Sequence, residues 1–114
     1  MASLRAPVAV PVEIRSDGAR GRVFRLAASV GEDGVRLARP APFEIGRPVE
    51  IAFALPLAEG FATLRLSAEV LHADADDEHA NEGAGGRELT FIEPPAEARR
   101  AISGYVRERL SLPA

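Results

Sequence analysis

Arginine supplies all of the positive side-chain charge in this sequence: 14 residues are basic and none is a lysine. The planar guanidinium group donates several hydrogen bonds at once, so it grips phosphates and the edges of guanine better than an ammonium group does. Half of these arginines precede residue 40, namely Arg5, Arg15, Arg20, Arg22, Arg25, Arg36 and Arg39. They surround residues 29–34, SVGEDG, whose backbone N–H groups would add to an anion site if the fold brought them together.

Two plainer explanations compete with a ligand site. The absence of Lys accompanies 21 alanines, no Gln and a single Asn, which is typical of a biased composition. Arginine stems also cover apolar surface, and their guanidinium groups pair with neighbouring carboxylates without any ligand. The positions of the arginines in the fold therefore decide between these explanations.

The sequence offers few candidate residues for catalysis or for metal binding. Both histidines, His72 and His79, flank or lie within the acidic segment 72–86, but the order of its carboxylates does not match a calcium-binding loop. No G-x-S-x-G nucleophile elbow and no Walker-type phosphate loop is present, and the chain has no cysteine. We therefore expect no catalytic residue, no cofactor and no metal site, and we predict that the protein is not an enzyme.

Composition favours one compact domain over residues 1–114. Apolar residues make up 46% of a 114-residue chain, which is enough for a core without disulfides or metals. The formal net charge of −3 argues against general nucleic-acid binding. No segment approaches the roughly 20 apolar residues of a membrane span, and Pro7 and Pro11 interrupt any signal-like stretch at the start. We expect a cytoplasmic protein without membrane insertion.

Hydrophobic periodicity predicts a mostly β fold. Period-two alternation predicts strands over residues 8–15, 22–28, 35–37, 49–55, 61–71 and 87–92. Residues 29–34 are expected to form a loop, and residues 72–86 a long flexible one. After Pro94 and Pro95 the period changes to about 3.6, which predicts a C-terminal helix over residues 95–111. Such an order is typical of an antiparallel barrel or sandwich closed by a helix.

The order of these pieces resembles that of a PilZ domain. The resemblance rests on PVAVPVEI at 7–14, GVRL at 34–37, FEIGRPVEI at 43–51, LRLSAEVLHA at 64–73, GGRELTFI at 85–92 and AEARRAISGYVRERL at 96–110. It implies a six-stranded antiparallel β-barrel with a C-terminal α-helix. It also implies a cyclic di-GMP ligand, bound by an R-x-x-x-R segment before the first strand and by a second motif, Asp or Asn, x, Ser, x, x, Gly.

Both family motifs are altered in this chain. Arg5 matches the first arginine of R-x-x-x-R, but Ala9 stands at the second. When the second motif is aligned on Gly34, Ser29 replaces the Asp or Asn and Gly31 replaces the Ser. The resemblance therefore implies candidate cyclic di-GMP contacts, some of them non-standard, at Arg5, Arg20, Arg22, Arg25, Ser29, Gly31, Gly34 and Arg36.

These departures predict weak or lost nucleotide binding. Each missing charge-assisted contact is worth roughly 1.5 to 3 kcal/mol, so two of them would weaken binding by more than about a hundredfold. Glu32 and Asp33 add negative charge beside a ligand that is itself anionic. The hypothesis is a signalling adaptor in cyclic di-GMP-linked regulation of motility, pili or surface behaviour that acts through a protein partner. The alternative is a genuine cyclic di-GMP receptor that uses Arg20, Arg22 or Arg25 instead.

Overall fold

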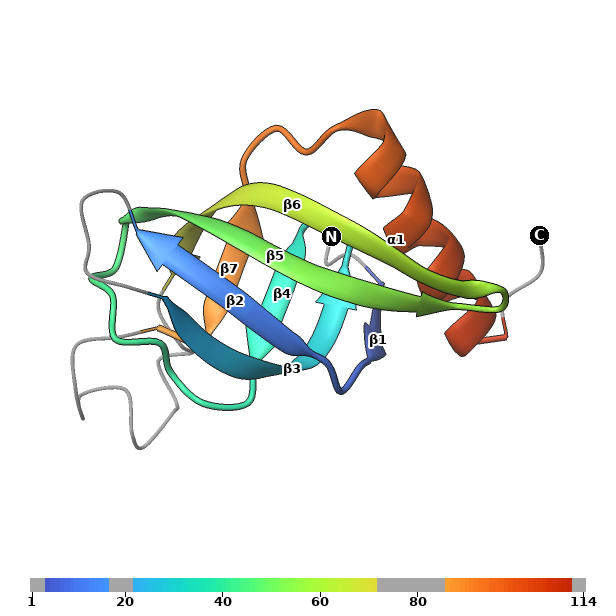
Figure 1. Cartoon of the computed structure of the whole chain (residues 1–114), viewed down its shortest axis with the longest axis horizontal. Coiled ribbons are helices and arrows are strands. Elements are labelled where there is room, and N and C mark those ends of the chain that lie inside the picture. Colours follow the sequence, from blue (N-terminus) through green and yellow to red (C-terminus); the bar gives the residue numbers. More distant parts are fainter. Residues whose placement is uncertain (1–3, 17–21, 72–85, 112–114) are drawn as a thin grey trace.

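The computed structural model describes residues 4–16, 22–71 and 86–111. Its elements, in chain order, are β1 (Arg5–Pro7), β2 (Pro11–Ser16), β3 (Val23–Gly31), β4 (Gly34–Leu37), β5 (Pro48–Leu57), β6 (Gly60–Leu71), β7 (Glu88–Phe91) and α1 (Ala96–Arg109). The strands form one antiparallel sheet in the order β1-β3-β2-β5-β6-β7-β4, and an additional pairing between β3 and β4 closes it (Figure 1). Strands β2 to β7 therefore form the expected six-stranded barrel, to which β1 adds at one end of β3.

The first predicted strand is two strands in the structure. Residues 8–10 separate β1 from β2, and both strands pair with β3. Pro7 and Pro11, which flank this connection, lack the backbone N–H that a continuous ladder would use. Two hydrogen bonds nevertheless hold the connection to β3, from Val8 N–H to the Ala28 carbonyl and from Ala27 N–H to the Val10 carbonyl.

The predicted loop at residues 29–34 is wrong, because β3 continues to Gly31 and β4 begins at Gly34. Gly31 and Gly34 face each other in the β3–β4 ladder, so Glu32 and Asp33 alone make the turn. A two-residue turn is the tightest common hairpin connection. The predicted long loop at 72–86 lies outside the described residues except for Gly86.

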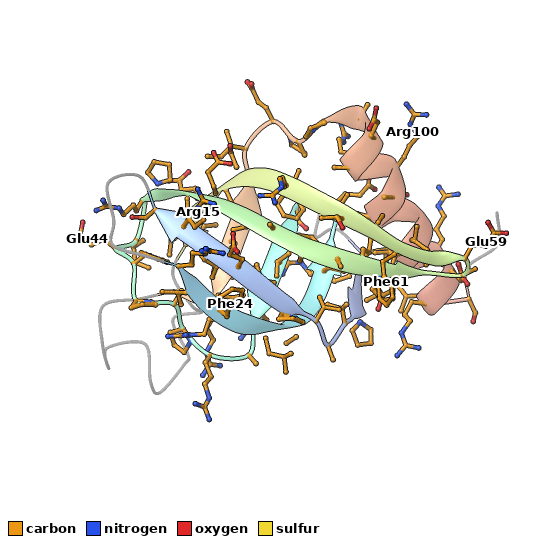
Figure 2. All side chains as sticks on the ribbon, in the orientation of Figure 1. Arg15, Phe24, Glu44, Glu59, Phe61 and Arg100 are labelled. Carbon is orange, nitrogen blue, oxygen red and sulfur yellow. The ribbon has the colours of Figure 1, made fainter. Side chains whose placement is uncertain are left out.

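Strand β3 turns its larger apolar side chains outward. Phe24 and Leu26 share one face, as the alternation predicts, but they are 57% and 50% exposed, and Figure 2 shows Phe24 on the outside of the barrel. Their register partners on β2 are Glu13 and Pro11, whereas Ile14 faces Val23 on the inner side. The pairing register, rather than the apolar pattern of β3, therefore decides which face of this strand is inside.

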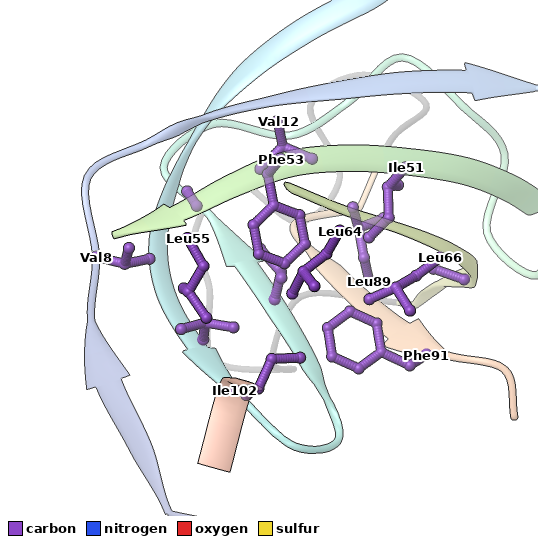
Figure 3. Close-up of a cluster of buried hydrophobic side chains, with 14 of the residues drawn as sticks. Val8, Val12, Ile51, Phe53, Leu55, Leu64, Leu66, Leu89, Phe91 and Ile102 are labelled. Carbon is purple, nitrogen blue, oxygen red and sulfur yellow. The ribbon is translucent and has the colours of Figure 1, made fainter. Parts of the chain in front are cut away.

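The barrel interior is filled by aliphatic and aromatic side chains (Figure 3). The alternation predicted for β6 is confirmed, since Leu64, Leu66, Ala68 and Val70 are buried between exposed or half-buried neighbours. α1 packs at one end of the barrel against β1, β3 and β5 (Figure 1). Its buried face consists of Ala98, Ile102, Tyr105 and Val106, as the helical period predicts.

Candidate functional site

Four short strand segments lie side by side on the outside of the barrel near the β3–β4 hairpin. Arg5 of β1 pairs with Gly31 of β3, Gly31 pairs with Gly34 of β4, and Arg36 of β4 pairs with Glu88 of β7. Ser29 lies between Pro7 and Arg36 in the same ladder. The barrel therefore brings together five of the eight predicted site residues, which are Arg5, Ser29, Gly31, Gly34 and Arg36. We call this surface, with Asp33 and Glu88, the hairpin rim.

Backbone packing explains both glycines of the hairpin rim. A Cβ atom on Gly31 would lie 2.7 Å from the Leu4 carbonyl oxygen and 2.8 Å from Arg5 Cγ. A Cβ atom on Gly34 would overlap the carbonyl oxygen of Leu89 in β7. Both positions thus need glycine so that neighbouring strands can approach, whether or not a ligand binds.

Carboxylates engage both guanidinium groups of the hairpin rim. Arg5 Nη1 donates to Glu88 Oε2 at 2.9 Å, and Arg5 Nη2 donates to Asp33 Oδ2 at 3.2 Å. Arg36 Nη1 donates to Glu88 Oε1 at 3.1 Å. Two positive and two negative side chains therefore form one connected network.

Arg5 carries its positive charge across the physiological pH range. Partial burial opposes the charged form, but the hydrogen bonds and negative charges of Glu88 and Asp33 outweigh it and raise the pKa of Arg5 above its ordinary value. Because the raised pKa lies far above neutrality, Arg5 contributes no change in stability across the physiological pH range. The charge that Arg5 contributes to the network therefore does not change with pH in this range.

The remaining candidate arginines lie elsewhere. Arg22 pairs with Glu13 at 3.3 Å, and Arg25 donates from Nε to the Pro40 carbonyl at 3.1 Å. Arg25 precedes Gly31 by six residues along β3, which separates their Cα atoms by about 20 Å. Arg20 lies outside the described residues. The structure thus places neither Arg22 nor Arg25 at the hairpin rim.

Comparison with known proteins matches residues 2–108 to the family model described as PilZ domain. This chain belongs to the PilZ domain family. PilZ domains are non-catalytic receptors of cyclic di-GMP, in agreement with the prediction that the protein is not an enzyme. A comparison with curated protein sequences found no match.

The fold of this PilZ domain is also found in a solved structure from Bacillus subtilis, that of the inhibitor of motility MotI/DgrA. The two chains share 17% sequence identity and superpose with a TM-score of 0.76. The likeness covers 97% of this chain but 51% of the MotI/DgrA chain, so this PilZ domain spans about half the length of that protein. At this identity the likeness establishes the fold, which confirms the predicted six-stranded barrel with its C-terminal helix.

Sequence reasoning missed Glu88, the carboxylate that contacts both arginines of the hairpin rim. Its strand was predicted, and the structure buries Leu89 and Phe91 while Glu88 is half-buried. The signal that could have found it is the pairing of β7 with β4, which puts Glu88 opposite Arg36. In this PilZ domain, Glu88 therefore belongs to the hairpin rim although it matches neither motif.

A second surface feature of this PilZ domain lies beside the tip of the β5–β6 hairpin. A groove of about 680 Å³ runs between residues 7–10, residues 56–58 and the last turn of α1, with Val8, Val10, Leu57 and Tyr105 among its walls. Phe61, opposite Pro56 in the β5–β6 ladder, is 73% exposed beside the hairpin tip (Figure 2). Phenylalanine is enriched at protein–protein interfaces relative to the rest of the protein surface.

The described residues contain no group of three His, Cys, Asp or Glu side chains arranged to hold a metal ion. Both histidines, His72 and His79, lie outside them. Among the same residues, no helix has the length and apolar character that crossing a membrane requires.

Proposed function

We propose that this PilZ domain is a signalling adaptor in cyclic di-GMP-linked regulation of motility, pili or surface behaviour. It acts in the cytoplasm through contacts with a protein partner, and its affinity for the nucleotide is weak or lost. The observation that carries the proposal is the engagement of Arg5, the remaining arginine of the family's first motif, by Glu88 and Asp33.

The charges of the hairpin rim support reduced affinity. Cyclic di-GMP presents two phosphate groups. A phosphate that approached Arg5 would meet two carboxylates that already accept hydrogen bonds from Arg5, and it would have to displace them or lie beside their negative charge. Ala9 supplies no second guanidinium, and Gly31 supplies no hydroxyl where the family motif has a serine. Each missing charge-assisted hydrogen bond removes roughly 1.5 to 3 kcal/mol from binding.

Titration calorimetry with cyclic di-GMP tests the nucleotide half of the proposal. We expect the wild-type protein to bind more weakly than the micromolar range, and Arg5→Ala to change the titration little. Arg22→Ala is titrated in parallel, because the receptor alternative uses Arg22, whose ion pair lies away from the hairpin rim. Micromolar or tighter binding that Arg5→Ala or Arg22→Ala abolishes would overturn the adaptor proposal in favour of the receptor alternative.

A complementation experiment tests the protein-contact half. In a strain that lacks the gene, we expect Arg5→Ala to restore motility or pilus function as well as the wild type does, because signalling does not depend on nucleotide capture. Phe61→Ser, which changes an exposed side chain beside the groove, should restore it poorly. The reverse pattern, with Arg5→Ala inactive and Phe61→Ser active, would contradict the proposal.

A further inference from the structure

One carboxylate of the hairpin rim bridges guanidinium groups from two other strands. Glu88 stands on β7, and its two oxygens accept from Arg5 on β1 at 2.9 Å and from Arg36 on β4 at 3.1 Å. The side chain of Glu88 is only 19% exposed, while those of Arg5 and Arg36 are 25% and 35% exposed. Guanidinium groups from two strands thus converge on a single, mostly covered anion that a third strand carries.

Two guanidinium groups converging on one anion form the arrangement that binds a phosphate group. Arginine donates to carboxylates and phosphates through the same fork of N–H groups, because both anions present pairs of oxygens to it. We propose that Arg5 and Arg36 form a phosphate-binding pair and that Glu88 fills it as a built-in anion. This inference rests on the proposed function, since it names the residue that keeps nucleotide affinity low.

Asp33 does not play this part, although it also contacts Arg5. It reaches Arg5 alone, at 3.2 Å, and its side chain is 45% exposed in the hairpin turn. Removing the charge of Asp33 leaves Glu88 between the two arginines, whereas removing the charge of Glu88 leaves Arg36 without its carboxylate in this network. The same change of one unit of net charge therefore has different consequences at the two positions.

This asymmetry provides a matched pair of variants. Glu88→Gln keeps the size of the side chain and removes its charge, while Asp33→Asn makes the same change at the neighbouring position. We expect Glu88→Gln to bind cyclic di-GMP at least about tenfold more tightly than the wild type, and Asp33→Asn to differ from it by less than about twofold. Inorganic pyrophosphate, titrated in parallel, reports the phosphate contribution without the guanine bases and should show the same order.

A double variant identifies the arginines that do the binding. Adding Arg36→Ala to Glu88→Gln should return the affinity to the wild-type level, because the phosphate then meets Arg5 alone. Glu88→Thr, whose β-branched side chain suits a strand, repeats the test if Glu88→Gln unfolds. Circular dichroism establishes that each variant is folded before titration.

The outcomes separate this inference from the proposed function. If the wild type binds cyclic di-GMP weakly and Glu88→Gln and Asp33→Asn bind it equally weakly, the proposal that Glu88 is a built-in anion is overturned. The adaptor proposal is unaffected by that result. Tight binding of cyclic di-GMP by the wild type would overturn the adaptor proposal. If the Glu88→Gln variant then bound the nucleotide no more tightly than the wild type, the proposal that Glu88 is a built-in anion would be overturned as well. A gain at Glu88→Gln that survives Arg36→Ala would exclude the arginine pair as its cause.

Discussion

Replacing Gly34 by alanine should destabilise the barrel at the point where it closes. Gly34 pairs with Gly31 on one side and with Thr90 on the other. A Cβ atom there would overlap the Leu89 carbonyl oxygen and lie 3.1 Å from the Leu89 carbonyl carbon and 3.2 Å from the Thr90 Cα atom. Because these atoms are all backbone, β7 has to move as a unit and cannot simply rotate a side chain away.

The expected loss of stability for Gly34→Ala follows from what that movement breaks. Overpacking of a tight site typically costs about 1 to 3 kcal/mol, and each ladder hydrogen bond that opens adds about 1 kcal/mol. Leu89, which would move with β7, is fully buried in the core, so the shift also disturbs packing. We therefore expect the free energy of unfolding to fall by about 2 to 4 kcal/mol.

Urea unfolding followed by far-UV circular dichroism measures this loss in a chain that has no tryptophan. Gly104→Ala is the control: Gly104 is exposed inside α1, and apart from its chain neighbours and the adjoining helix backbone, no described residue has an atom within 4 Å of the added Cβ. This control should raise the free energy of unfolding by up to about 1 kcal/mol, since alanine favours the helix. A Gly34→Ala protein as stable as the wild type would refute the packing explanation and leave ligand contact as the reason for the glycine.

Three further variants probe the same structure by urea unfolding. Tyr105→Phe removes the hydrogen bond from the Tyr105 hydroxyl to the Pro7 carbonyl at 2.8 Å and should cost about 1 kcal/mol; an unchanged midpoint would show that this bond does not help to hold β1. Ile102→Ala opens a cavity between α1 and the barrel and should cost about 2 to 5 kcal/mol, whereas a loss below about 1 kcal/mol would mean that the helix packs loosely. Arg22→Ala breaks an exposed ion pair with Glu13 and should change stability by less than about 1 kcal/mol; a larger loss would indicate that the pair helps to hold the β2–β3 hairpin.

The sequence predicted the fold well where period and burial agree. In β6, five consecutive inward positions alternate with outward ones, and the structure keeps that alternation from residue 62 to residue 70. The change to a 3.6-residue period after residue 95 correctly predicted α1 and its buried face. Both elements pack one continuous apolar face on the core, so local pattern and tertiary structure demand the same residues.

Prediction failed where a strand's partners decide its structure. Alternation shows that Phe24 and Leu26 share a face, but only the register with β2 puts that face outside. The glycines at 31 and 34 suggested a loop, yet they are required because strands approach closely there. The outward orientation of β3 and the hairpin that replaces the predicted loop both depend on contacts between strands, which a local pattern does not contain.

The sequence predicted which segments form the candidate site, but it did not predict the ion pairs within that site. The proximity of Arg5 to residues 29–34 follows from the barrel topology that the family resemblance implies, and the structure places them in register. The contact between Arg5 and Glu88 joins residues 83 positions apart and depends on β4 and β7 meeting as the barrel closes. No spacing rule within the sequence specifies such a contact.

The number of arginines in this PilZ domain therefore says little about its affinity for anions. What matters for each guanidinium is which acceptor already faces it, and the same residue type fills different roles here. Arg25 donates to the carbonyl of Pro40, whereas Arg5 and Arg36 share the carboxylate of Glu88. A phosphate would gain from Arg5 and Arg36 only the difference between its own interaction and that of the carboxylate it displaces, and that difference is small when the carboxylate is already well placed. In this chain, we accordingly expect the acidic residue on β7 to be a better guide to nucleotide affinity than the arginine count.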